Sequence, residues 1–130
     1  LNRLRGAGNI RVLEGPEIRT LFLVFDTHRD ELLYSDVKGR NPFRDLRVRQ
    51  ALYHAIDIGA IQRVTMRGQS VPTGTLFPEQ VNGYVREEDV RLPYDTARAR
   101  ALLAEAGYPN GFAVTLDCPN NRYINDEQIC

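Results

Sequence analysis

The segment that joins Cys118 to Cys130 concentrates residue types that can hold a small charged ligand. Its candidate binding residues are Asn120, Asn121, Arg122, Tyr123 and Asn125. The guanidinium of Arg122 can offer two parallel hydrogen bonds to a carboxylate. The asparagines can bond peptide-like groups, and Tyr123 adds a flat apolar ring with a polar tip. On residue chemistry alone two interpretations stay open, a ligand-binding loop and a capped turn with Arg122 in solvent.

The predicted position of this loop fits the binding interpretation. The loop should leave a strand and enter the N-terminus of a helix, with Asn125 as the N-cap and Asp126 in the first turn. Ligands of α/β proteins bind beyond the carboxyl ends of strands, and helix N-termini favour anions.

Cys118 and Cys130 are the two cysteines of the chain and are candidates for a disulfide. A bridge between them would close a short loop and stabilise the fold by roughly 2–3 kcal/mol. Such a bridge persists only in an oxidising compartment. The alternative is two buried free thiols.

Other chemistry finds little support. His28 and His54 are far apart in the sequence and have no nucleophile motif beside them, so no catalytic residue is assigned. The histidines and cysteines lack the close pairs that metals use, so no metal site is predicted. Gly6 and Gly8 have no third glycine and no following helix to complete a phosphate loop, and no cofactor is predicted.

Composition indicates one ordinary globular unit. The 130 residues are 42% hydrophobic and 26% charged, and 17 basic residues balance 17 acidic ones. This balance argues against a nucleic-acid partner. No internal domain boundary is visible. Because the chain stops about one turn into its last predicted helix, we expect residues 1–130 to be one fragment of a larger protein.

Hydrophobic periodicity predicts alternating strands and helices. Strands are expected at 10–14, 18–25 and 112–118. Helices should begin after the caps Asp45, Asp57 and Asp95, the second ending near Gly68 and the third at Gly107. Residues 69–83 should form an ordered loop. The order predicts an α/β fold, a mixed sheet with helices packed on it.

Two sequence stretches resemble those of the family 5 extracellular solute-binding proteins, the dipeptide and oligopeptide receptors of bacterial ABC importers. The first runs from Asn41 through Pro42-Phe43-Arg44-Asp45 to Asp57, and the second from Pro93-Tyr94-Asp95 to Phe112. A loop rich in proline and glycine lies between them, as it does in the family. The likeness extends in order over residues 18–130.

The resemblance implies a longer receptor whose two lobes close on a ligand, with this chain in the second lobe of a type II periplasmic-binding-protein-like fold. Arg122 occupies the place where short-peptide receptors bind the peptide carboxylate. The acidic residue that receives the peptide amine is absent from this chain. The implied setting is the bacterial periplasm, and the implied partners are a peptide ligand and a membrane ABC permease. The family is not enzymatic.

Departures from the family leave the ligand open. Asp26 stands where asparagine is frequent, and the stretch 27–40 is longer than usual. Some relatives bind nickel complexes, haem or sugars, and a similar domain can serve as the ligand sensor of a transcription regulator. Alone, the fragment should bind no peptide measurably, and its uncovered apolar surface should promote self-association.

Overall fold

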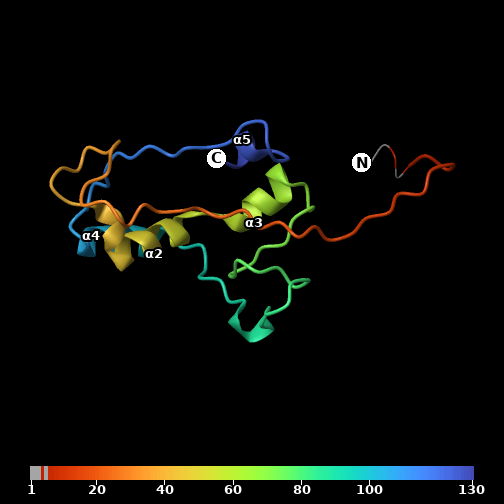
Figure 1. Ribbon diagram of the computed structural model, residues 1–130, viewed down its shortest axis with the longest axis horizontal. Helices are drawn as coiled ribbons and strands as arrows, with labels where there is room; N and C mark the ends of the chain where they lie inside the picture. Colours follow the sequence, from red (N-terminus) through yellow and green to blue (C-terminus); the bar gives the residue numbers. More distant parts are fainter. Residues whose placement is uncertain (1–3, 5) are drawn as a thin grey trace.

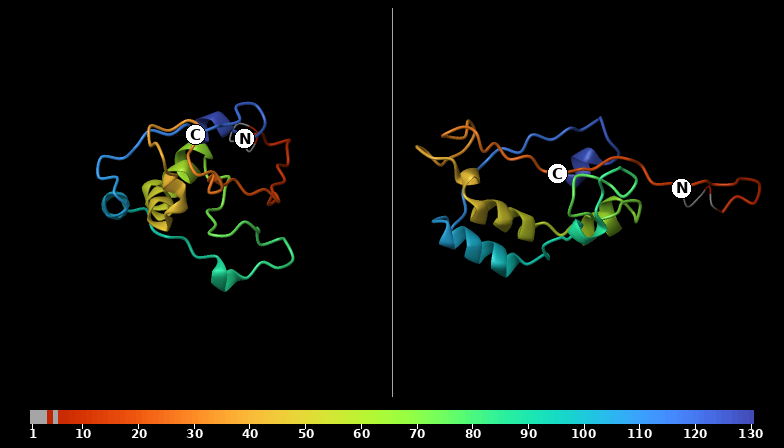
Figure 2. Two further views of the ribbon diagram at one scale, coloured as in Figure 1. Left: turned by 60° about the vertical axis from the view of Figure 1, so that its left-hand side comes forward. Right: turned by 60° about the horizontal axis from the view of Figure 1, so that its bottom comes forward.

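The computed structural model describes Leu4 and residues 6–130, and it is an elongated assembly of short helices and long connecting segments (Figure 1, Figure 2). The elements from residue 42 onward are η1 (Pro42–Arg44), α2 (Leu46–Ala55), α3 (Ile58–Ala60), the π-helical turn η2 (Ile61–Thr65), η3 (Arg86–Glu88), α4 (Thr96–Glu105) and α5 (Asp126–Ile129).

Helices α2 and α4 form the main packed unit and run antiparallel (Figure 2). Ala51 faces Ala99 and Leu102 in a buried cluster, where the two alanines let the helices approach closely. The helix ends are tied by hydrogen bonds to backbone carbonyls. The Asp95 N–H donates to the His54 carbonyl at 2.9 Å, and Arg47 Nη1 donates to the Glu105 carbonyl at 2.7 Å.

A second buried cluster, built around aromatic rings, also packs against α2. Phe43 stands at its centre, with ring centroids 5.1 Å from Phe25 and 6.1 Å from Phe112. Tyr108 lies 4.9 Å from Phe112, and fully buried Val48 connects the cluster to the helix. Offset and edge contacts of this kind are the favoured geometries of aromatic rings.

The predicted helix starts are confirmed. The Asp45 side chain accepts a hydrogen bond from the Arg47 N–H, and the Asp95 side chain accepts one from the Arg98 N–H. Asp57 accepts from the Ala60 N–H, and its short helix continues through η2 to Gly68, which adopts φ +78°. Each carboxylate satisfies an N–H group that has no partner inside its helix.

The predicted ordered loop at 69–83 is held by one carboxylate that follows it. Asp89 accepts hydrogen bonds from the Gly74 N–H, the Tyr84 hydroxyl and the Thr73 hydroxyl. These bonds, the one from Gly74 foremost, hold the pKa of Asp89 below its ordinary value. Gly74 is needed here because a Cβ would lie 2.4 Å from the Val90 carbonyl oxygen.

The three predicted strands do not form in the described residues, so the predicted mixed sheet is not shown. Segments 10–14 and 18–25 are irregular, and 112–118 takes part only in an isolated antiparallel bridge between Ser35 and Val114. A strand needs a neighbour that accepts and donates its backbone hydrogen bonds. No described segment runs beside 18–25 in this way, and Phe22 and Val24 remain 60% and 80% exposed.

The helices of the described residues are short. None of them is both long enough and apolar enough to cross a lipid bilayer.

Candidate ligand-binding loop between Cys118 and Cys130

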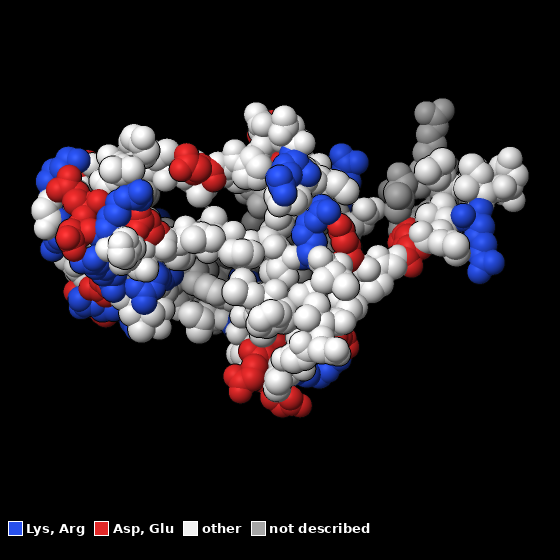
Figure 3. Space-filling model, in the orientation of Figure 1, with Lys and Arg blue, Asp and Glu red and all other residues white. Residues whose placement is uncertain are grey.

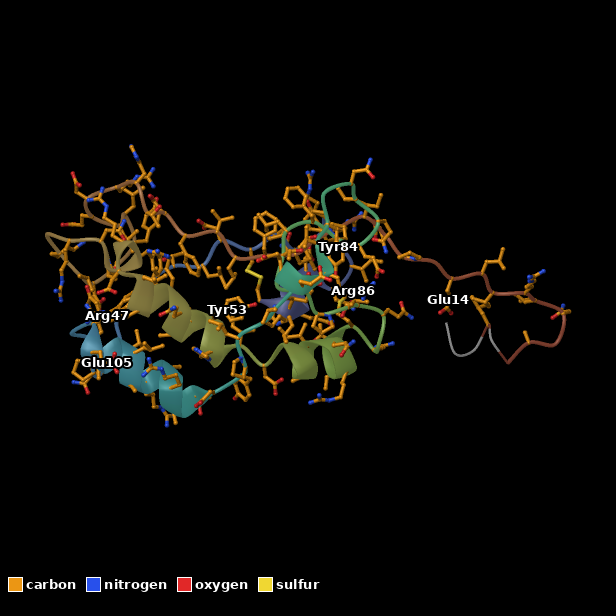
Figure 4. All side chains as sticks on the ribbon, turned by 90° about the horizontal axis from the view of Figure 1, so that it is seen from below. Glu14, Arg47, Tyr53, Tyr84, Arg86 and Glu105 are labelled. Atoms are coloured by element: carbon orange, nitrogen blue, oxygen red, sulfur yellow. A yellow bond between two sulfur atoms is a disulfide. The ribbon has the colours of Figure 1, made fainter. Side chains whose placement is uncertain are left out.

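The two cysteines that bracket the candidate loop are joined in the structure. Their Sγ atoms form a disulfide, and the Cα atoms of Cys118 and Cys130 lie 6.4 Å apart (Figure 4). The bridge therefore brings both ends of the loop together beside α5.

Inside the loop, the carboxylate of Asp126 organises the backbone. Its Oδ2 accepts hydrogen bonds of 2.9 Å from the N–H groups of Arg122 and Tyr123, and its Oδ1 accepts one of 2.8 Å from the Glu127 N–H. These bonds, that from Tyr123 foremost, lower the pKa of the buried Asp126 carboxyl against the opposing effect of desolvation. Asp126 thus fixes the backbone from which the Arg122 side chain projects.

Arg122 is exposed and is held against the ring of the next residue. Its Nε donates to the Tyr123 hydroxyl at 2.9 Å, and its guanidinium carbon lies 5.4 Å from the ring centroid. Among the described residues no carboxylate forms an ion pair with Arg122, whose two terminal nitrogens keep their donors for other groups.

A second cation reaches the same ring from the N-terminal part of the chain. The guanidinium carbon of Arg19 lies 5.0 Å from the Tyr123 ring centroid. The sequence analysis missed Arg19, because nothing in a lone arginine at the start of an apolar run shows that it will lie beside a distant tyrosine.

The three candidate asparagines play different parts. Asn120 and Asn121 are exposed. The side chain of Asn125 points toward η2, where its Nδ2 donates to the Thr65 carbonyl at 2.9 Å. Asn125 is the N-cap residue of α5, as predicted, but it adopts the left-handed conformation with φ +59° and its side chain makes no capping bond. The structure brings Arg122 and Tyr123 together and uses Asn125 to anchor the loop.

A cavity of about 430 Å³ lies elsewhere, and no residue of the 119–125 loop lines it. Its walls come from segments 22–24, 32–34 and 114–117, together with Asp26, Arg29 and Phe43. These are largely the segments in which strands were predicted. The cavity therefore lies between segment 22–24 and the two segments that meet at the bridge between Ser35 and Val114.

The two histidines lie in different environments. His54 is buried, with Nδ1 2.7 Å from the Pro93 carbonyl oxygen, and His28 is exposed. No group of three possible metal ligands occurs within the described part of the chain. Figure 3 shows acidic and basic side chains interspersed on the face that it presents.

Comparison with known proteins identifies the class. The family described as "Bacterial extracellular solute-binding proteins, family 5 Middle" matches residues 1–130. The chain belongs to this family. No solved structure matches it at a significant level.

The curated relatives carry different ligand names. The chain is 42% identical over 82 residues to a "Glutathione-binding protein GsiB" of Pectobacterium atrosepticum, which covers 63% of this chain and 16% of that protein. It is 31% identical over 112 residues to a "Heme-binding protein A" of Haemophilus influenzae, which covers 86% of this chain and 18% of that protein. The chain thus spans less than a fifth of the length of either relative.

Membership of this family implies several general properties. It implies a type II periplasmic-binding fold. Family 5 proteins are periplasmic in bacteria, deliver their ligand to a membrane permease, and form a family of solute-binding proteins and not of enzymes.

Proposed function

We propose that the chain is part of the substrate-binding component of a bacterial ABC importer for short peptides. Residues 1–130 form a single piece of the second lobe of a longer receptor. Membership of family 5 supports the receptor class, and the ligand is captured in the cleft between two lobes that close around it. The closed receptor then docks on the membrane permease. No bond is made or broken in this cycle.

The peptide assignment rests on the hydrogen-bond partners of the Arg122 guanidinium. Its guanidinium is oriented by the Tyr123 hydroxyl and has no carboxylate partner among the described residues. A guanidinium in this state can receive the C-terminal carboxylate of a peptide through two parallel bonds. Asn120, Asn121 and Tyr123 supply further polar groups beside it, and Asn125 holds the loop in place.

The disulfide supports a periplasmic location for this chain. Bridges such as Cys118–Cys130 are rare in the reducing cytosol and persist in the periplasm. This observation disfavours the cytoplasmic ligand sensor of a transcription regulator.

Native mass spectrometry and calorimetry of the full-length receptor test the proposal. Short peptides released from the purified receptor would support the ligand class. Arg122→Ala should then weaken binding of those peptides about tenfold or more, because a charged hydrogen-bonded pair is lost. Arg100→Ala, at an exposed position of α4, is the matched control and should change affinity less than twofold. An unchanged affinity of Arg122→Ala would remove Arg122 from the site.

A haem-type ligand is the second candidate, because the relative named for haem binding matches the larger share of this chain. The same mass measurement distinguishes the two. A bound mass equal to haem would keep the receptor class and end the peptide assignment.

We also propose that the 130-residue chain by itself self-associates. Leu21, Phe22, Leu23 and Val24 form a run of exposed apolar side chains. Sedimentation of the isolated chain should show oligomers that dissociate on dilution. A monomer at all concentrations would contradict this expectation.

A further inference from the structure

The guanidinium groups of two arginines lie over the ring of Tyr123. No other tyrosine in the described part of the chain has two such contacts. Arg19 lies 5.0 Å and Arg122 5.4 Å from its ring centroid. Tyr53 and Tyr108 each carry a single guanidinium. The two guanidinium carbons can be separated by no more than the sum of their distances to the shared centroid, a span that an extended peptide of about three residues covers.

Arg19 and Arg122 differ in their carboxylate partners. Arg19 Nη2 lies 2.6 Å from a carboxylate oxygen of Glu17. Among the described residues Arg122 forms no ion pair, and the neighbouring Asp126 carboxylate accepts backbone N–H groups of its own loop. Two guanidiniums beside one ring repel each other, and an anion that contacts both offsets this repulsion. The terminal nitrogens of Arg122 therefore stay available to a ligand carboxylate.

Glu17 is held weakly in its place beside Arg19. The two side chains are 61% and 40% exposed, and ion pairs of this kind contribute little to stability. A ligand carboxylate can therefore replace that of Glu17 at small cost. Without a ligand, the Glu17 carboxylate occupies the position on Arg19 that a ligand carboxylate would take.

We propose that Arg19 is a second anion-binding residue of the candidate site and that the site prefers ligands with two carboxylates. Arg122 receives the C-terminal carboxylate of the peptide, and Arg19 receives the second carboxylate in exchange for Glu17. The inference rests on the proposed function, and it narrows the ligand class from short peptides to acidic ones.

The test uses the full-length receptor and two matched pairs of ligands in calorimetry. Ala-Glu differs from Ala-Gln by one carboxylate, and glutathione differs from 4-aminobutanoyl-Cys-Gly in the same way. In at least one pair the dicarboxylate should bind about threefold more tightly, the scale of an exposed ion pair. Arg19→Gln should abolish this preference and change the affinity of the monocarboxylate less than twofold.

Two further variants separate the roles of the cluster. Arg122→Gln should weaken both members of a pair, and Glu17→Gln should tighten only the dicarboxylate, because the resident competitor is gone. Arg100→Gln, at an exposed position of α4, is the control.

The outcomes distinguish this inference from the proposed function. If Arg122→Gln weakens both members while Arg19→Gln leaves the preference intact, the inference is overturned and the peptide assignment stands. A preference for the dicarboxylate in neither pair, or binding of none of the four ligands, also overturns the inference. If ligands bind but Arg122→Gln has no effect, the proposed role of Arg122 fails as well.

Discussion

Removing the bridge between Cys118 and Cys130 should release the candidate binding loop. The bridge joins residues 12 apart in the sequence. The loop-closure entropy for a ring of this size corresponds to about 3 kcal/mol at room temperature. Because every 1.4 kcal/mol is a factor of ten in an equilibrium constant, the loop should open roughly a hundredfold more often without the bridge.

Hydrogen exchange followed by mass spectrometry measures this opening in the full-length receptor. The reporters are the amides of Arg122 and Tyr123, which donate to Asp126 and are protected while the loop is closed. The double variant Cys118→Ser/Cys130→Ser is compared with the native protein. Exchange in a peptide covering residues 119–129 should accelerate up to the hundredfold limit, while a peptide from α2 should keep its native rate.

Two results would refute this reasoning. Acceleration of less than about threefold would show that Asp126 and the bond from Asn125 to Thr65 hold the loop without the bridge. Equal acceleration of the α2 peptide would show that the bridge supports the whole protein and not the loop alone.

Two other predictions concern the core and the pH dependence of the loop. Leu102→Ala should cost about 2–4 kcal/mol in urea unfolding, because Leu102 is 2% exposed between α2 and α4, whereas Arg100→Ala should cost little. The Asp126 carboxyl has a lowered pKa, so its stabilisation of the loop is complete above the ordinary carboxyl pKa and is lost as the pH falls through the folded-state pKa. Protection factors of the Tyr123 amide should therefore fall on acidification, and in Asp126→Asn they should be low at every pH.

The helices could be predicted because their signals are local. Asp45 and Asp95 each accept a bond from an N–H two or three residues ahead, and such contacts depend on little beyond the neighbouring chain. The buried stripe of α4, Ala99 and Leu102, likewise follows from a repeat of three to four residues. Asn125 shows the limit of this reasoning. Asparagine is a favoured N-cap residue, but the Asn125 side chain makes no capping bond and donates to the carbonyl of Thr65, far away in the chain.

The strands could not be predicted by the same means. Apolar alternation at 18–25 and 112–118 describes side chains suited to a sheet, but a sheet exists only where a second segment supplies hydrogen bonds. Within the described residues the single contact of this kind is the bridge between Ser35 and Val114. The sequence pattern therefore indicates that these segments have side chains suited to a strand, but it does not show whether another segment pairs with them.

The sequence by itself determined the family, the helix boundaries and the residue types of the binding loop, because each depends on residues close together in the chain. Only the tertiary structure decided what surrounds Arg122. It joined Cys118 to Cys130 and brought Arg19 onto the ring of Tyr123. The contact between Arg19 and Tyr123, which are far apart in the chain, depends on the path of everything between them, which no local pattern encodes.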